Sequence, residues 1–258
     1  MLRIRLTTAA VVLPVVLAIV IFASTAVFTI FIGIVTAWGL YEVSAMSGSR
    51  PATAALTMLC GATPAIVLLI HDQGPWVAPA AVIVALGGLT LRVGLRGPGR
   101  ANTATVALGA LGVGVLFPYL AFVRNGARGI AIIVLMLLIV VASDSGAYFA
   151  GRSLGRIKLL PKVSPHKTVE GAIGGLVASL IAGLVLRPAL APNLLRRQVI
   201  AFAIIVTLLA QLGDLANSAL KRIAGVKDSG WIFPGHGGLL DRTCSLVFPA
   251  VFTYYYFY

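Results

Sequence analysis

The chain has 258 residues, of which 59% are hydrophobic and only 10% are charged, and its mean hydropathy is +1.02. A soluble domain is about 45–50% apolar and about 25% charged, so this composition excludes a soluble enzyme, a disordered chain and a nucleic-acid-binding domain. The net charge of +13 arises from 20 basic and 7 acidic residues. Because the basic residues lie between hydrophobic runs, they indicate membrane topology and contacts with anionic headgroups or phosphates, not nucleic acid.

Hydrophobic runs long enough to cross a bilayer follow one another along the chain. About 20 apolar residues span the hydrocarbon core, and charged residues, prolines and glycines separate nine candidate runs. The sequence therefore predicts an all-α, polytopic integral membrane protein. The runs are residues 7–22, 24–45, 52–70, 76–92, 102–123, 129–150, 169–188, 198–220 and 243–258.

The basic residues predict which side of the membrane each loop faces. If the N-terminus is cytoplasmic, every lysine and most arginines fall on the cytoplasmic side of nine spans, as the positive-inside rule requires. The two most polar loops, residues 151–168 and 221–242, then lie on that same side.

The acidic residues indicate where a functional site lies. Five of the seven fall between positions 144 and 241, so we expect residues 1–128 to be scaffold helices and residues 129–258 to hold the site. Asp144 and Asp214 follow hydrophobic runs, and a carboxylate near the bilayer centre costs roughly 3 kcal/mol on insertion scales. Each is a candidate functional residue, although an aspartate at a helix end that only reaches water is the alternative.

One helical stripe at the end of the run 198–220 combines both signs of charge. It consists of Asp214, Ser218, Lys221 and Arg222, spaced i, i+4, i+7 and i+8. This spacing places the four side chains on one face of a helix. A purely structural pairing of Asp214 with Arg222 is the alternative.

The loop after this stripe, residues 225–242, is rich in glycine and in charge. Glycine permits close approach of the backbone to a ligand, so the glycines around His236 indicate a loop whose N–H groups face an anion. Carboxylates beside an anion indicate a divalent cation, and Mg²⁺ needs only one or two carboxylates together with waters and substrate oxygens. The charged residues of the loop are Lys227, Asp228, Asp241 and Arg242.

The other polar loop ends at the expected start of a helix. Ser164-Pro165-His166-Lys167-Thr168 precedes the run 169–188, and Thr168 can cap that helix. A helix N-terminus preceded by lysine and hydroxyls attracts anions, so Ser164, Lys167 and Thr168 are candidate phosphate-binding residues. Any N-cap gives a similar pattern, so a purely structural cap is the alternative.

Both loops resemble those of a known family. Residues 218–242 read S-A-L-K-R-I-A-G-V-K-D-S-G-W-I-F-P-G-H-G-G-L-L-D-R and resemble the signature of the phosphatidate cytidylyltransferases, also called CDP-diacylglycerol synthases. Residues 144–175 resemble a second block of that family. The chain departs from the pattern at Cys244, where the family has Asp, and at His166, where Gly is frequent.

The resemblance implies that CTP and phosphatidate react to give CDP-diacylglycerol and diphosphate, with Mg²⁺, in a bacterial-type inner membrane. Together with the residue patterns, it assigns three aspartates as metal ligands: Asp214, Asp241 and Asp144. The expected catalytic residues are Asp144, Asp214, Lys221, Arg222, Lys227, His236 and Asp241. The expected substrate-binding residues are Ser164, Lys167, Thr168, Ser218, Asp228 and Arg242.

Two other functions compete with this interpretation. A CTP-dependent lipid kinase would share the nucleotide and the lipid, but there the lipid would attack the γ-phosphorus of CTP. An ion-coupled transporter would use intramembrane aspartates without turning over CTP, but its polar residues would lie on both sides of the bilayer. Homodimerisation through an N-terminal span is compatible with the sequence, and no motif demands it.

Overall fold

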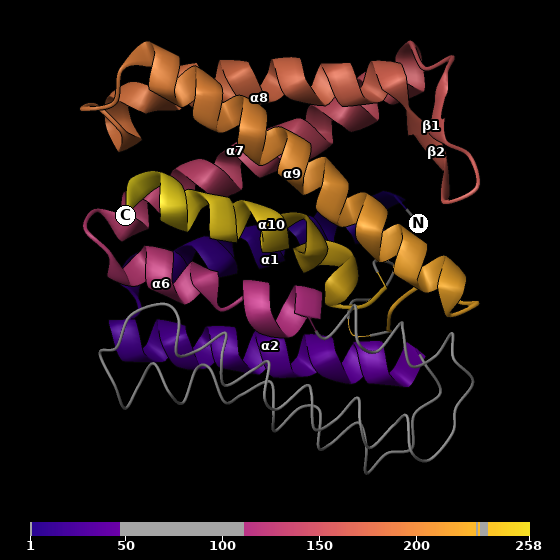
Figure 1. Cartoon of the computed structure of the whole chain (residues 1–258), viewed down its shortest axis with the longest axis horizontal. Helices are drawn as coiled ribbons and strands as arrows, with labels where there is room; N and C mark the ends of the chain where they lie inside the picture. Colours follow the sequence, from indigo (N-terminus) through magenta and orange to yellow (C-terminus); the bar gives the residue numbers. More distant parts are fainter. Residues whose placement is uncertain (1, 47–110, 231, 233–236) are drawn as a thin grey trace. The chain divides into compact units, whose positions relative to one another are not determined.

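The computed structural model describes residues 2–46, 111–230, 232 and 237–258 (Figure 1). Within these ranges the chain is mostly helical. The α-helices are α1 (Leu2–Phe22), α2 (Thr25–Met46), α6 (Tyr119–Asn125), α7 (Gly129–Ser153), α8 (Val169–Leu190), α9 (Arg196–Ile223) and α10 (Leu240–Phe257). A π-helix, η1, covers Leu111–Val115, and two strands, β1 (Lys158–Leu160) and β2 (Ser164–Thr168), complete the elements. The predicted runs 52–70 and 76–92 lie outside the described residues.

Four of these helices, α2, α7, α8 and α9, are long and apolar enough to cross a membrane. They match the predicted runs 24–45, 129–150, 169–188 and 198–220, which confirms the expectation of a helical membrane protein for this part of the chain. The runs 7–22 and 243–258 fall in α1 and α10.

One expectation needs correction. The described part of the run 102–123 is not one continuous helix, because η1 and α6 are separated by a turn at Pro118, whose missing N–H interrupts a helical ladder. The described part of the chain is mostly helical, as an all-α membrane protein should be, and it also holds one short element that was not expected. The loop 151–168 contains an antiparallel hairpin in which Lys158 pairs with Thr168 and Leu160 with Ser164.

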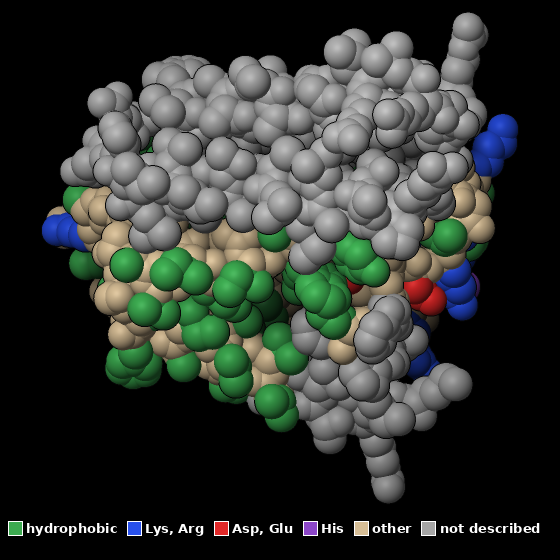
Figure 2. Space-filling model, turned by 90° about the horizontal axis from the view of Figure 1, so that it is seen from below, with side chains coloured by type: hydrophobic (Ala, Val, Ile, Leu, Met, Phe, Trp, Pro, Cys, Tyr) green, Lys and Arg blue, Asp and Glu red, His purple; other side chains and the backbone are tan. Residues whose placement is uncertain are grey.

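Helix α8 carries its large side chains on the outside. The exposed set recurs every four residues and consists of Ile173, Val177, Ile181 and Val185. The buried set has the same spacing and consists of Gly171, Gly175, Ser179 and Gly183. A helix in water would bury its aliphatic stripe, whereas lipid solvates such a stripe and small residues allow neighbouring helices to approach. Hydrophobic side chains likewise make up much of the described part of the face in Figure 2.

Small residues also set the distance between α7 and α8. A Cβ atom at Gly146 would lie 2.5 Å from the Ala178 Cβ and 2.7 Å from the Gly174 carbonyl oxygen. A Cβ atom at Gly174 would overlap the Ala150 side chain. The two helix backbones therefore pack in direct contact, and the hairpin β1–β2 lies where α8 begins (Figure 1).

The chain forms two compact units. One comprises Met1–Phe122 with Leu220–Cys244, and the other comprises Val123–Ala219 with Ser245–Tyr258. The last residues of α9 and the first turn of α10 thus belong with the N-terminal helices. The sequence analysis divided the chain at residue 128 by where the functional residues are expected, not by packing. That functional division stays a prediction.

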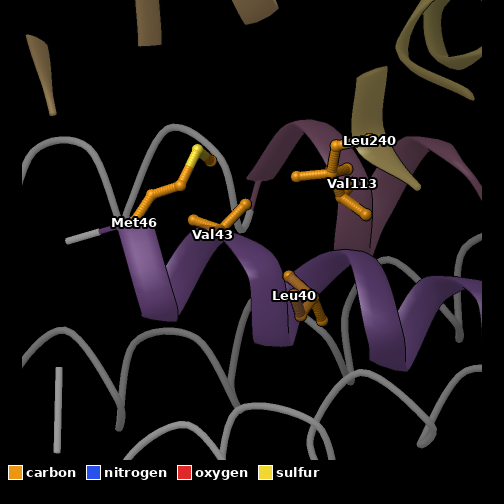
Figure 3. Packing of buried hydrophobic residues seen from close by; sticks show 5 residues of the cluster. All are labelled: Leu40, Val43, Met46, Val113 and Leu240. Atoms are coloured by element: carbon orange, nitrogen blue, oxygen red, sulfur yellow. The ribbon is translucent and has the colours of Figure 1, made fainter. Parts of the chain in front are cut away.

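The first unit has a hydrophobic cluster that joins α2 to the beginning of α10. Its buried members are Leu40, Val43, Met46, Val113 and Leu240 (Figure 3). Gly39 lies against the same cluster, where an added Cβ would be 2.9 Å from the Val113 Cγ1. This packing brings the C-terminal half of α2 beside the first turn of α10.

Candidate active site

The hairpin β1–β2 fixes the N-terminus of α8. Thr168 has extended backbone angles, and its hydroxyl oxygen accepts a hydrogen bond from the Gly171 N–H at 3.1 Å. This confirms the predicted N-cap. Just before β1, the Ile157 N–H donates to the Glu170 carboxylate at 3.1 Å, and the Ile157 carbonyl accepts from the Val169 N–H at 2.9 Å. These contacts hold the strand and the first turn of α8 together.

Glycine at position 171 is required by this arrangement. A Cβ atom there would lie 2.9 Å from the Ala147 carbonyl oxygen and 3.0 Å from the Thr168 hydroxyl. Thr168 itself is buried, with 5% of its surface exposed. The cap is therefore enclosed between α7 and the first turn of α8.

Lys167, immediately before this cap, forms an ion pair with Asp214 on α9. Its Nζ lies 2.6 Å from the Asp214 Oδ2, and the two side chains are 26% and 45% exposed. The Nζ atom is itself buried. Its contact with Asp214 does not have the angles of a hydrogen bond, and no other described residue accepts a hydrogen bond from it. An ammonium group has three donors, so Lys167 retains donor capacity. The alternative pairing of Asp214 with Arg222 is not the one observed.

A second ion pair joins Lys221, at the end of α9, to Asp241, in the first turn of α10. The Lys221 Nζ donates to the Asp241 Oδ1 at 2.5 Å, and these side chains are only 16% and 8% exposed. The Asp241 Oδ2 accepts three further hydrogen bonds, from the Ser229 N–H at 2.9 Å, the Ser229 hydroxyl at 3.0 Å and the Gly238 N–H at 3.1 Å. Asp241 thus ties both ends of the loop to α9.

The surroundings of Asp241 keep its carboxylate ionised. Burial is the largest single influence and raises the pKa of Asp241, but it is outweighed by the hydrogen bond from Lys221, by those from the backbone of Ser229 and Gly238, and by the charge of Lys221. The net effect is a pKa below the ordinary value for aspartate.

A buried carboxylate that the sequence analysis did not select lies against the same loop. Glu42 on α2 is 3% exposed and accepts hydrogen bonds from the backbone N–H groups of Leu239 and Leu240 at 2.8 and 2.9 Å. Its Oε2 also lies 3.0 Å from the Ser229 hydroxyl. The signal was present in the sequence, because Glu42 is an acid near the end of a membrane-spanning run, but it stood in the half of the chain expected to be scaffold.

The remaining predicted site residues occupy less enclosed positions. The exposed ones are Asp144, Arg222, Lys227, Asp228 and Arg242, and the partly buried ones are Ser164 and Ser218. His236 lies outside the described residues. Among the residues that are described, no group of three or more His, Cys, Asp or Glu side chains is placed to hold a metal ion.

The carboxylate of Asp214 is more available to Mg²⁺ than the carboxylate of Asp241. Asp214 is half exposed and pairs with Lys167, so it can add a cation that also carries water and substrate oxygens. Both oxygens of Asp241 already accept hydrogen bonds from protein groups. The metal-binding roles expected for Asp144, Asp214 and Asp241 stay predictions.

Comparison with known proteins identifies the family. The profile of the cytidylyltransferase family matches residues 3–258. A phosphatidate cytidylyltransferase of Bacillus subtilis (strain 168) is 38% identical over 151 residues, which are 58% of this chain and 56% of that protein. Phosphatidate cytidylyltransferases of Staphylococcus saprophyticus and Staphylococcus aureus (strain COL) are 35% and 34% identical over 188 and 190 residues, in each case 71% of this chain and 72% of the relative. Because the profile spans almost all of the sequence, the chain belongs to the cytidylyltransferase family.

Proposed function

We propose that the chain transfers the cytidylyl group of CTP to phosphatidate, giving CDP-diacylglycerol and diphosphate. The observation that carries this proposal is the position of Lys167. Its buried ammonium group keeps donor capacity at the capped N-terminus of α8, 2.6 Å from a half-exposed carboxylate. Donors for phosphate oxygens and a ligand for a cation therefore stand side by side.

The reaction brings two anions together, so its main requirement is charge neutralisation. An oxygen of the phosphatidate phosphate attacks the α-phosphorus of CTP, the bond from that phosphorus to the oxygen bridging to the β-phosphate breaks, and diphosphate leaves. Lys167 and the N–H groups at the start of α8 bind phosphate oxygens, as helix N-termini do. Because the nucleophile arrives on the lipid, the protein contributes positioning and electrostatic stabilisation and needs no nucleophilic side chain.

Asp214 is the residue that would hold Mg²⁺, and Asp144 and Asp241 are the further ligands proposed from the sequence. The ion would supply charge neutralisation and orientation of the triphosphate. The Lys221–Asp241 pair lies at the C-terminal end of α9, directly after the hydrophobic run 198–220. There, Lys221 binds a phosphate oxygen while Asp241 holds its ammonium group in place. Further positive charge around the substrates comes from Arg222, Lys227 and Arg242. Hydroxyl groups come from Ser164, Thr168 and Ser218. The proposed set also includes Asp228 and His236.

The proposed setting is the inner membrane of a bacterium, with nine spans, a cytoplasmic N-terminus and a site that opens to the cytoplasm. The distribution of lysine and arginine supports this orientation, and it lets CTP reach the site from water while phosphatidate arrives from the lipid. Homodimerisation is part of the same proposal and rests on the sequence alone.

An assay of the purified protein with phosphatidate, CTP and Mg²⁺ tests the proposal, with the lipid product and diphosphate measured together. We expect both to form in equal amounts. Lys167→Met should lower kcat/KM on the order of 100-fold, as loss of a donor to a developing charge does. Lys162→Met, in the exposed turn between β1 and β2, is the matched control and should behave as wild type. Absence of lipid product from the wild type, or equal kinetics for the two variants, would contradict the proposal.

A further inference from the structure

Glu42 is the most enclosed acidic side chain in the described part of the chain. It sits in the last turns of α2, with 3% of its surface exposed. A carboxylate removed from water is costly unless donors surround it. Four donors do so here, the N–H groups of Leu239 and Leu240, the Ser229 hydroxyl, and the indole N–H of Trp38 at 3.3 Å.

Two of these donors belong to the beginning of α10. The first N–H groups of a helix have no partner within the helix, and the positive end of the helix dipole favours an anion there. Glu42 supplies that anion from a helix about 200 positions earlier in the sequence. It therefore caps α10 through tertiary structure, in place of a local capping side chain.

The loop backbone fits closely around this carboxylate. A Cβ atom at Gly230 would lie 2.6 Å from the Glu42 Oε1, and one at Gly238 would lie 2.5 Å from its Oε2. Both are positions of the family-like signature at 218–242. Gly238 is one of the glycines near His236 that the sequence analysis assigned to an anionic ligand, and here it lies against an anionic side chain of the protein itself.

Glu42 also connects to the ion pair at the end of α9. The Ser229 hydroxyl lies 3.0 Å from the Glu42 Oε2 and 3.0 Å from the Asp241 Oδ2. One hydroxyl has one proton to donate, so the two carboxylates share it, and the position of Ser229 links those of Glu42 and Asp241. Asp241 in turn holds Lys221.

We propose that Glu42 is a positioning residue of the cytidylyltransferase reaction: it fixes the loop before α10 and, through Ser229, the orientation of Asp241 and Lys221. The kinetic effect expected of Glu42 rests on the proposed function. The contacts of Glu42 with the loop do not depend on that function. This positioning role gives the N-terminal helices a direct part in the geometry of the site.

Amide hydrogen exchange of the purified protein tests the structural part without any turnover. In Glu42→Gln the side-chain amide presents N–H donors where the carboxylate accepted, so residues 237–244 should exchange at least about tenfold faster than in wild type. Ile32→Ala, which removes a buried apolar side chain from the same helix, is the control for general destabilisation and should leave exchange in 237–244 unchanged. Equal exchange in wild type and Glu42→Gln would overturn the inference.

Kinetics with CTP and phosphatidate test the functional part. Glu42→Gln should lower kcat on the order of 100-fold, as small misplacements do, with KM for CTP within about threefold. Ser229→Ala should lower kcat less, and the double variant should be no worse than Glu42→Gln, because both act along one path. Additive losses, or a loss in Ile32→Ala equal to that in Glu42→Gln, would reject a positioning role. A wild type without cytidylyl transfer would instead reject the proposed function and leave the exchange result standing.

Discussion

At the scale of single residues, hydrogen-bond donors from the protein compensate the buried carboxylates for the loss of water. Asp241 and Lys221 are largely removed from water, and the pair is stable because the second carboxylate oxygen also accepts hydrogen bonds from the loop. Breaking a buried pair from one side leaves an uncompensated charge, which is worse than removing both partners.

Substitution of Lys221 tests this description of the pair. Lys221→Met should lower the free energy of unfolding on the order of 3 kcal/mol, and the double variant Lys221→Met/Asp241→Asn should recover part of that loss. Thermal unfolding in detergent measures both. A double variant less stable than Lys221→Met would show that Asp241 owes its stability to the loop donors and not to Lys221.

The lowered pKa of Asp241 sets the pH range of its contribution. A carboxyl group whose pKa is lower in the folded than in the unfolded chain stabilises the fold above its unfolded pKa of about 3.9. The stability is lost only as the pH falls below about 4 and through the folded value. Asp241→Asn should therefore lose its stability difference from wild type in strongly acidic buffer and keep it unchanged between pH 6 and 8, roughly the range where only histidine titrates. A stability difference that varied across that neutral range would contradict this assignment.

Cys244 is the residue at which the chain departs from the family signature, and it is buried with 8% of its surface exposed. A thiol is a poor ligand for Mg²⁺, whereas Cys244→Asp would add a carboxylate to the first turns of α10. We expect Cys244→Asp to remain active, and Mg²⁺ should raise its thermal midpoint more than that of wild type, because an ion that binds only the folded state stabilises it. An inactive variant with no response to Mg²⁺ would show that the pocket around this residue differs from the family pattern.

Residue patterns predicted part of the site and missed its long-range contacts. The stripe from Asp214 to Arg222 and the cap at Thr168 follow from local spacing, and the structure contains both the helix and the cap. The pairing of Asp214 with Lys167, and of Glu42 with the loop, joins residues that are distant in sequence. Helical periodicity carries no information on such pairs.

At the scale of elements, the contact between α7 and α8 depends on the absence of side chains. The hydrophobic runs predicted both helices, but the runs alone did not show which face meets a neighbour. The hairpin between them was missed because β1 has only three residues and because β2 is polar and contains Pro165, which is atypical of a strand.

Gly174 tests the helix contact. Gly174→Val would place its side chain against Ala150 and force α7 and α8 apart, which should cost roughly 1–3 kcal/mol, as overpacking does. Ile173→Val, at the adjacent lipid-facing position, is the control and should be close to neutral. Thermal unfolding in detergent compares the two, and equal midpoints would mean that the helices can separate without cost.

At the scale of the whole molecule, composition and hydrophobic runs predicted a helical membrane protein, and the described helices agree. The same patterns placed the site in the C-terminal half alone. That placement stays a prediction. In the structure, the region 220–244 belongs to one compact unit with the N-terminal helices, and Glu42 on α2 accepts hydrogen bonds from Leu239 and Leu240 at the end of the signature loop. Composition cannot predict such an association, because it depends on which helices pack together.

The position of the label in CTP tests the central claim most directly. The purified protein is incubated with phosphatidate, Mg²⁺ and CTP labelled on either the α- or the γ-phosphorus, and the lipid is extracted. Cytidylyl transfer predicts that α-label enters the lipid and that γ-label leaves as diphosphate. Lipid that carries γ-label and no α-label would show attack at the γ-phosphorus, which is the reaction of a lipid kinase, and would contradict cytidylyl transfer.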